Sequence, residues 1–389
     1  MIYFDNASTT PVDKKVIDIM LPYFNLYYGN PGSMHNKGLI ALNAIYDSRK
    51  KVAEILNCDT KEIIFTGSGT ESDNLAILGF ARKNKNKGNH IIISTIEHPA
   101  VKESALHLIE EGFEVSFVNV DKDGLVDLNE LKNLIRNDTI LVSIIYANNE
   151  IGVVQDLKEI SKICHEKNVV FHTDACQAPQ YLDIDVKNLD VDMMSLNGSK
   201  INGPKGIGCL FVKKGILLES IIYGGGQENN LRSGTENVPL IVGFAKALEI
   251  VTNEKEENFK HVKELQKKLI DDLLKIPETK LNGSLEKRLP NNVNISFLNV
   301  EGESIILMLN EEEIYVSTGS ACSSKSLEPS HVLLALGLPH ELAHSSIRFT
   351  LNKFNTIEEV KIVVEKIKEI VEQLRKMSPM HQSLKELGY

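Results

Sequence analysis

Short apolar runs rich in β-branched residues alternate with amphipathic stretches between about residues 61 and 212. The runs predict seven strands, at Ile63–Thr66, Ile91–Thr95, Val115–Val120, Ile140–Tyr146, Val169–Thr173, Met193–Leu196 and Gly208–Val212. Between two of them, VQDLKEISKICHEKN places Leu157, Ile160 and Cys164 at helical spacing, with charged residues on the opposite face. Repeated strand, helix and strand units are typical of a largely parallel sheet that helices cover on both sides. The pattern therefore predicts an α/β fold.

The pattern changes beyond about residue 239. Residues 239–274 have the spacing of a long amphipathic helical region, and its charged middle, TNEKEENFKHVKELQKK, is expected to face solvent. NVNISFL and SSIRFTL predict two more strands, and a final helix is expected to begin at Thr356, where Glu359 completes a capping box. Because 389 residues exceed what one core usually serves, we place a boundary between a large and a smaller domain in the helical region.

The composition narrows the classes of function. The formal net charge is −10, with no block of basic residues and no tryptophan, which argues against nucleic acid as the direct ligand. The five cysteines are widely spaced and include no C-x-x-C pair, so neither a disulfide framework nor a metal site is predicted. These cysteines, and an amino terminus without the pattern of a signal peptide, predict a cytoplasmic protein. No apolar run approaches the ~20 residues of a membrane span, so no membrane contact is expected.

An aspartate and a lysine stand at the ends of two predicted strands. Asp174 follows the run at Val169–Thr173, and Lys200 comes shortly after Met193–Leu196. Because an α/β sheet gathers the carboxyl ends of its strands at one crevice, both side chains are expected to face one ligand. A pyridoxal phosphate (PLP) enzyme needs this arrangement, since a lysine amine holds the cofactor as an imine and a carboxylate keeps its ring nitrogen protonated. The alternative interpretation is a surface lysine and an unrelated strand-end carboxylate.

Further segments carry groups that suit such a cofactor. Gly67–Thr70 follow one strand and precede an expected helix, so their N–H groups and a hydroxyl suit a phosphate, with an ordinary turn as the alternative. His98 follows another strand end, where its ring is expected either to stack on a cofactor and exchange protons or to be purely structural. Three amides near strand ends are expected either to reach a ring substituent or to cap turns: Asn148, Asn149 and Gln177.

A cysteine and an arginine complete the candidates. Cys322 lies in STGSACSSKSLEPSHVLLALG, a polar stretch that suits a nucleophile on a mobile loop. With an ordinary pKa of ~8.5, only about 3% of its thiol would be ionised at neutral pH, so it would need a nearby proton acceptor or cation. An exposed cysteine without a task is the alternative. Arg348 interrupts the apolar strand SSIRFTL, and its guanidinium is expected either to bind a substrate carboxylate or to form an internal ion pair.

Ten segments, in order, resemble the signatures of the cysteine desulfurases of the NifS/IscS type, which belong to the class V aminotransferase family of fold-type I PLP enzymes. They run from residue 3 to about residue 351: YFDNASTTP, NPGSMH, GSGTESDNLAI, EHPAV, ANNEIGVVQD, HTDACQ, NGSKINGPKGIG, RSGTENV, GSACSSKSLEPSHVL and SIRFTL. The resemblance implies a large PLP-binding domain over residues 15–255, with a mostly parallel central sheet flanked by helices. It also implies a smaller α+β domain, formed by residues 1–14 and 256–389, that carries the cysteine loop.

The resemblance also assigns roles to individual residues. It implies that Lys200 forms the imine, that Cys322 forms a persulfide, and that His98 stacks on the ring and carries protons. The substrate carboxylate would be bound by Asn149 and Arg348. The other cofactor contacts that it implies are Gly69, Thr70, Asp174, Gln177, Asn197, Ser199 and, from the second subunit of a homodimer, Thr235.

The chain departs from the family's usual pattern at three positions. Where Ser-x-His-Lys is common, it has Asn197, Gly198, Ser199 and Lys200, so a possible imidazole donor to the phosphate is lost and a hydroxyl is kept. We therefore expect altered cofactor affinity and unchanged chemistry. Cys176 stands where threonine is common, which is expected to place a second thiol close to the cofactor.

The implied reaction removes sulfur from L-cysteine, giving L-alanine and a persulfide on Cys322. The sulfur would pass to an acceptor protein, either an iron–sulfur scaffold of the IscU/NifU kind or a tRNA-thiolation enzyme. Two alternatives keep Asp174 and Lys200 in the same roles, namely a selenocysteine lyase and an aminotransferase, although a transaminase has no use for a thiol on a mobile loop. A third alternative is a sulfur-scaffold-binding protein without turnover of its own.

Overall fold

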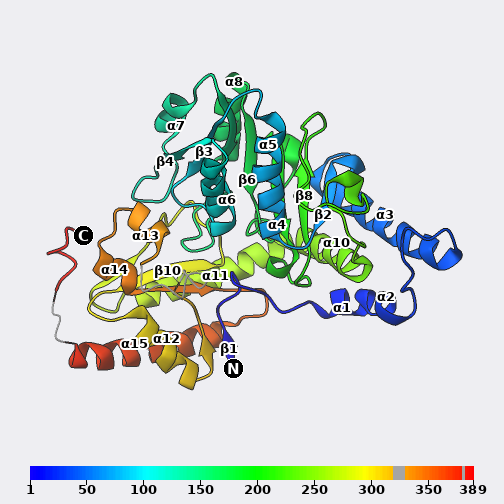
Figure 1. Cartoon of the computed structure of the whole chain (residues 1–389). Helices are drawn as coiled ribbons and strands as arrows, with labels where there is room; N and C mark the ends of the chain where they lie inside the picture. Colours follow the sequence, from blue (N-terminus) through cyan, green and yellow to red (C-terminus); the bar gives the residue numbers. More distant parts are fainter. Residues whose placement is uncertain (319–328, 379–381) are drawn as a thin grey trace.

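A seven-stranded sheet forms the centre of the larger lobe in the computed structural model, which describes residues 1–318, 329–378 and 382–389 (Figure 1). Its strands are β2 (Ile63–Thr66), β3 (His90–Ser94), β4 (Glu114–Val118), β5 (Thr139–Ser143), β6 (Val170–Asp174), β7 (Met193–Asn197) and β8 (Gly208–Val212). They agree with the seven predicted strands to within a few residues, so the α/β class is confirmed.

The sheet has the strand order β2-β8-β7-β6-β5-β3-β4. Neighbouring strands from β7 to β4 are parallel, whereas β8 is antiparallel to both β7 and β2. Only residues 198–207 connect β7 to β8, which is too short for the crossover of a dozen or more residues that parallel neighbours need. The sheet is therefore largely parallel, as predicted, with one strand reversed by its short connection.

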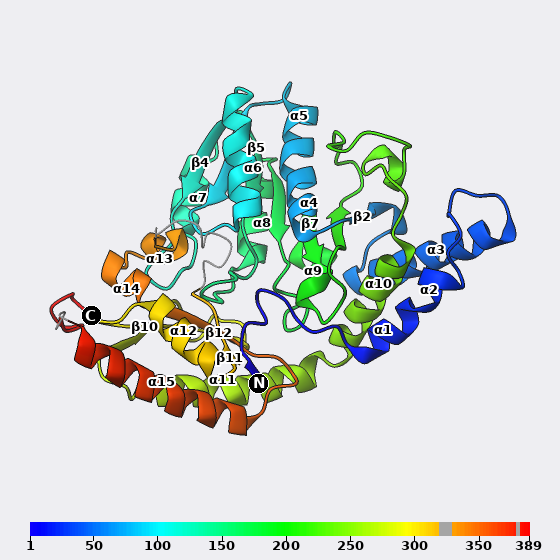
Figure 2. The same cartoon turned by 60° about the horizontal axis from the view of Figure 1, so that its bottom comes forward.

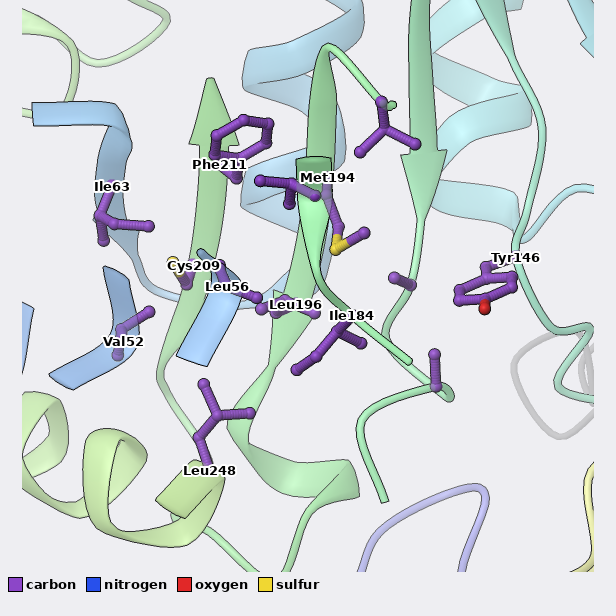
Figure 3. Packing of buried hydrophobic residues seen from close by; sticks show 14 of the residues in the cluster. Val52, Leu56, Ile63, Tyr146, Ile184, Met194, Leu196, Cys209, Phe211 and Leu248 are labelled. Atoms are coloured by element: carbon purple, nitrogen blue, oxygen red, sulfur yellow. The ribbon is translucent and has the colours of Figure 1, made fainter. Parts of the chain in front are cut away.

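Alternate residues of each strand point into two different hydrophobic clusters, one on each face of the sheet. In β2, Ile63 and Phe65 belong to one cluster and Ile64 to the other. The first cluster is covered by α3 (Asn36–Leu56), α8 (Leu157–Glu166) and α10 (Val238–Asn253), and Figure 3 shows part of its packing. The second is covered by η2 (Leu75–Gly79), which continues α4 (Gly69–Asn74), and by α5 (Phe80–Asn84) and α6 (Pro99–Glu110). Helices thus cover both faces, as the alternation predicted.

A second, smaller lobe is built on the three-stranded antiparallel sheet β12-β10-β9 (Figure 2). Its elements are β9 (Thr279–Leu281), β10 (Asn292–Phe297), β12 (Ser346–Thr350), α11 (Lys255–Leu273), α12 (Gly302–Glu311) and α15 (Ile357–Met377). The amino terminus joins this lobe, because β1 (Ile2–Tyr3) pairs with β11 (Ile314–Tyr315) and Phe4 is buried in the same hydrophobic cluster. The division at residues 14/15 and 255/256 stays a prediction.

The helical region at residues 239–274 contains two helices where the sequence suggested one long region. The backbone leaves the helical conformation at Glu254, between α10 and α11, so that α11 can turn to cover the second sheet. Lys353 holds this junction through an ion pair with Glu254 at 2.7 Å. The last helix, α15, begins as predicted, because Thr356 and Glu359 form the reciprocal bonds of a capping box at 3.2 and 2.9 Å.

The remaining elements are short, and most of them lie in the connections between the longer helices and strands. They are α1 (Lys14–Met20), α2 (Pro22–Asn25), α7 (Leu128–Leu134), α9 (Val186–Leu189), α13 (His331–Ala335), α14 (His340–His344) and the turns η1 (Thr60–Glu62), η2 (Leu75–Gly79), η3 (Gly198–Lys200) and η4 (Glu228–Asn230). Among the helices in the described ranges, none is both long and apolar enough to cross a membrane.

Candidate active site

The aspartate, lysine and histidine singled out from the sequence meet at the carboxyl ends of the central strands. Asp174 is the last residue of β6, Lys200 ends the η3 turn that directly follows β7, and His98 caps the start of α6 shortly after β3. Side-chain atoms of Asp73, His98 and Asp174 lie within 4.8 Å of one another. The charges of both Asp174 and Lys200 act on the His98 ring, which places all three groups in one site.

Asp174 and Cys176 form the buried floor of this site. Asp174 is 4% exposed, and its carboxylate accepts a hydrogen bond from the Cys176 backbone N–H at 2.9 Å. Burial, followed by the charge of Asp174, raises the pKa of the Cys176 thiol well above its usual range. The second thiol therefore lies close to the site, as its position suggested, but stays protonated. The Cys176 side chain also limits which residue fits at position 69, because a Cβ at Gly69 would lie 2.6 Å from the Cys176 Sγ.

The start of α4 offers backbone donors at the same edge of the sheet. Ser68 caps the helix by accepting the Glu71 N–H at 3.0 Å. Gly69 and Thr70 belong to the first turn, whose N–H groups have no acceptor within the helix. Since α4 continues through η2 into α5, the dipole of a longer helix adds to these donors. The arrangement suits a phosphate group.

Asn197 and Ser199, the residues that depart from the family pattern, lie beside this helix start. A Cβ at Gly69 would be 3.2 Å from the Asn197 Cβ and 3.4 Å from its Nδ2. The Asn197 Oδ1 accepts hydrogen bonds from the backbone and the hydroxyl of Ser199, at 3.0 and 3.1 Å. With its oxygen held in this way, the asparagine turns its amide donor toward the start of α4. An amide donor is therefore available where the family commonly has a serine, and Ser199 offers a hydroxyl where the family commonly has a histidine.

His98 presents an N–H donor to the site. Its Nδ1 accepts the Ala100 backbone N–H at 3.1 Å, so the proton of the neutral ring lies on Nε2. Burial lowers the pKa of His98, an effect that Asp174 opposes and Lys200 reinforces, so the ring is neutral at pH 7. The predicted proton uptake by this ring requires the other tautomer, in which Ala100 releases Nδ1.

The amino-terminal segment DNASTT lines the site, a placement that the sequence analysis did not predict. Lys200 Nζ donates a hydrogen bond to the carbonyl of Ser8, and Arg348 Nη2 donates to the Ser8 hydroxyl at 2.7 Å. Gln177 Nε2 donates to the carbonyl of Ala7 at 3.0 Å. Although YFDNASTTP was a recognised segment, its contacts join residues far apart in the chain, and no local pattern signals them.

Arg348 is almost completely buried, at 2% exposure, and forms the internal ion pair that was one of its two interpretations. Its Nη2 lies 2.7 Å from Asp5 Oδ1, and its Nη1 donates to the backbone carbonyl of Asn149 at 3.1 Å. A carboxylate partner of this kind offsets the cost of burying the guanidinium. Asn149 and Arg348 are thus brought together, while their binding of a substrate carboxylate stays a prediction.

The structure describes two of the three remaining candidates. The Asn148 side chain donates to the Ile96 carbonyl at 2.8 Å and accepts the Glu150 N–H at 2.9 Å, so the turn-capping interpretation applies to it. Thr235 is exposed, on the segment between β8 and α10. Cys322 falls within residues 319–328, outside the described residues.

The polar groups fit the three regions of PLP. A buried carboxylate, Asp174, suits the ring nitrogen, an amine at Lys200 suits the aldehyde, and the first turn of α4 suits the phosphate. These groups come from β6, the end of β7 and α4, which the parallel sheet aligns at one edge.

The comparisons with known proteins point the same way. A profile described as Aminotransferase class-V matches residues 2–363. A protein named cysteine desulfurase IscS, from Methanosarcina thermophila, is 52% identical over 97% of this chain and 94% of its own length. A protein named cysteine desulfurase IscS 1, from Archaeoglobus fulgidus, is 49% identical over 98% of this chain and 100% of its own length.

Two solved structures extend the similarity to the fold. One described as a NifS-like protein has a TM-score of 0.91 and 39% identity, covering 96% of this chain and 99% of that one. Another, described as SspA in complex with cysteine, has a TM-score of 0.80 and 35% identity, covering 92% and 100% of the two chains.

Proposed function

Because this chain belongs to the class-V aminotransferase family and is a PLP-dependent cysteine desulfurase of the IscS type, we propose that its reaction is carried by Lys200, Asp174, His98 and Cys322. The reaction takes sulfur from L-cysteine, releases L-alanine and leaves the sulfur on the enzyme as a persulfide. The relatives are named as enzymes, and the match covers nearly their full length. Both facts argue against the interpretation as a binding protein without turnover.

The observation that carries the residue assignment is that two cationic side chains contact Ser8. Lys200 donates to its carbonyl, and Arg348 donates to its hydroxyl at 2.7 Å. An amine and a guanidinium that reach one residue are close enough to act on two ends of one amino acid. Arg348 would bind the substrate carboxylate through its planar fork, while Lys200 Nζ removes and returns the proton at the substrate Cα.

Bound PLP supplies the electron sink that makes bonds at the substrate Cα labile. We expect Asp174 to face the ring nitrogen, Gln177 to face the ring hydroxyl and His98 to lie against the ring. The phosphate would be bound by Gly69, Thr70, Asn197, Ser199 and Thr235 of the partner subunit.

Cys322 is proposed as the persulfide-forming residue because the other four cysteines are held as neutral thiols. All four are free, and burial raises the pKa of each of them, to about 12 for Cys58. A thiol attacks as its thiolate, so these four are poorly suited to attack the substrate sulfur at neutral pH. By contrast, the segment around Cys322 is polar in composition, with Ser320, Ser323 and Ser324 beside the cysteine.

Incubation of the purified holoenzyme with L-cysteine and a reducing thiol tests the proposed function. We expect alanine and sulfide in equal amounts, since the reducing thiol releases the sulfur of the persulfide. Transfer of the amino group to a keto acid without sulfide would instead identify an aminotransferase. Turnover of selenocysteine without turnover of cysteine would identify a lyase.

A homodimer is supported by exposed apolar side chains on α1–α3 and their connecting loops. These helices and loops form an arm that projects from one side of the larger lobe (Figure 1). The arm residues are Ile17, Ile19, Leu21, Phe24, Leu26, Tyr27, Tyr28, Met34, Leu39, Ile40, Leu42 and Tyr46. A group of exposed apolar side chains on neighbouring elements is typical of an interface. The segment that carries Thr235 lies next to the arm, because Glu228 forms an ion pair with Arg49 of α3 at 2.6 Å.

Charging the arm is expected to separate the subunits. The double variant Tyr28→Glu/Met34→Glu changes side chains that are 64% and 95% exposed, so the fold of each chain should be retained. Light scattering should give twice the chain mass of 43.4 kDa for the unmodified protein and a single chain mass for the variant. Desulfurase activity should fall at least about tenfold when the subunits separate. Each site would then lose Thr235 of the partner subunit and, with it, about one charge-assisted hydrogen bond to the phosphate.

Leu307→Glu is the matched control, because Leu307 is 68% exposed but belongs to α12 of the other lobe. It should leave both mass and activity unchanged. A fully active monomer of the arm variant would show that the site needs no second subunit.

We also propose a cytoplasmic location and transfer of the sulfur to an iron–sulfur scaffold of the IscU/NifU kind or to a tRNA-thiolation enzyme. Free thiols at all four cysteines in the described ranges support a reducing compartment. The names of the relatives support a sulfur donor without specifying the acceptor.

A further inference from the structure

Asp73 is a buried carboxyl group beneath the active site that has no role in the steps above. It lies in α4, and its side chain is 1% exposed. Its Oδ1 has no hydrogen-bond partner in the part of the chain that the structure describes. Since its side-chain oxygen is within 4.8 Å of side-chain atoms of His98 and Asp174, a second carboxyl group stands next to the one expected to face the ring nitrogen.

Asp73 forms no salt bridge with a lysine or an arginine within the part of the chain that the structure describes. Within the described ranges, its only ion-pair neighbour is His172, whose Nε2 lies 3.7 Å from Asp73 Oδ1. The His172 ring nitrogens are bonded to the hydroxyls of Ser143 and Ser195, at 2.8 and 3.0 Å. Burial lowers the pKa of His172 to about 4, so this ring is neutral.

The other titratable groups around Asp73 come from each neighbouring element. They are Glu97 and His98 before α6, Asp174 and Cys176 at the end of β6, Lys200 after β7, and Glu71 on α4 itself. Glu71 is already paired with Arg232 at 2.8 Å. Among the charged groups, Asp174 has the largest effect on the pKa of Asp73, which its negative charge raises.

Two carboxyl groups this close in a buried site cannot both ionise without a large repulsion, so the pair retains a proton. The contacts indicate which of them holds it. Asp174 Oδ1 accepts the Cys176 N–H at 2.9 Å, so this oxygen already faces a donor. Asp73 Oδ1 has no such donor among the described residues.

We propose that Asp73 is a positioning residue that keeps its proton at neutral pH, so that Asp174 is the single anion at the ring-nitrogen end of the site. The inference rests on the proposed function, because it concerns the charge offered to the cofactor. One negative charge matches one protonated ring nitrogen, whereas two would leave an uncompensated anion in a buried region. Burial, then the charge of Asp174, raises the pKa of Asp73 well above its usual range, and the Ser195 hydroxyl only partly opposes this.

Infrared spectroscopy of the full-length protein at pH 7 tests the proton directly, because a protonated carboxyl group has its own carbonyl band. Asp73→Asn should remove one such band. The matched control is Glu97→Gln, since burial raises the pKa of Glu97 to about 8 and its band should be separate. If Asp73→Asn failed to fold, the unmodified protein would be labelled with ¹³C at its aspartates. The carbonyl band of a protonated aspartate should then shift. Unchanged carboxyl bands in both experiments would overturn the proposal.

Cofactor affinity, measured by equilibrium dialysis against pH, tests the role toward the site. A positive ring nitrogen favours ionisation of Asp73. The ratio of the PLP affinity of the unmodified protein to that of Asp73→Asn should therefore increase as pH rises. We expect a ratio close to one at about pH 6 and several-fold at about pH 9. A large ratio that does not change with pH would mean that Asp73 is already ionised, contrary to the proposal. Failure to bind PLP at any pH would instead refute the proposed function, while the infrared result would still report the proton on Asp73.

Discussion

Replacing Lys200 with alanine is expected to lower the turnover of L-cysteine by at least about a thousandfold. Loss of a positioned proton-transfer group alone costs roughly 10²–10⁴-fold, and the covalent hold on the cofactor is lost with it. In the structure this amine donates to the Ser8 carbonyl, at the place where Asp174 and Arg348 also converge. Single-turnover formation of alanine, measured with excess PLP, separates lost chemistry from weakened cofactor binding.

Lys205→Ala is the matched control for this variant, because Lys205 is an exposed lysine on the loop that follows. It should keep normal turnover and normal cofactor absorbance. Reduction of the unmodified holoenzyme with borohydride should leave a pyridoxyl group on the peptide that contains Lys200. Its recovery on another lysine would show that the assignment is wrong.

Replacing Cys322 with serine is expected to retain the coloured cofactor and to abolish persulfide formation. Alanine production should fall by at least about a thousandfold, since removal of a covalent nucleophile can cost roughly a million-fold. A serine hydroxyl is not ionised near neutral pH and does not attack the substrate sulfur. Incubation with ³⁵S-labelled cysteine, followed by peptide mapping, should place the label on Cys322 in the unmodified protein and nowhere in the variant.

Cys58→Ser provides the comparison, because the Cys58 thiol is partly exposed and its pKa is raised to about 12 by burial and by two neighbouring acidic residues. This variant should form the labelled persulfide at the normal rate. Alanine release at the original rate from Cys322→Ser would show that another group is the nucleophile.

The elements of the fold were largely predictable because they depend on contacts that are local in the sequence. The seven strands follow from apolar runs of about five residues, and the capping box at Thr356 and Glu359 needs only four consecutive positions. The convergence of Asp174 and Lys200 was predictable as well, since a parallel sheet aligns the ends of its strands. The reversed direction of β8 and the break at Glu254 were not, although the short connection before β8 was a usable signal.

Several residues of the site were missed because their neighbours are distant in the chain. Asp5 and Ser8 reach Arg348 across some 340 positions, and the sequence offered only two equal interpretations of that arginine. Asp73 lies inside the recognised segment GTESDNLAI, yet its carboxyl group matters only because β6 brings Asp174 beside it. A helix residue shows no sign in the sequence of the acid that it will face.

The sequence by itself determined the α/β class, the family and the chemical types at the site, because periodicity and motif order are properties of the chain alone. Tertiary structure alone decided that Arg348 is paired with Asp5, that the amino terminus lines the site and that two carboxyl groups share one buried region. The physical reason is that charge, burial and pKa depend on the distance between groups and on the water excluded around them. Only the folded chain sets those two quantities.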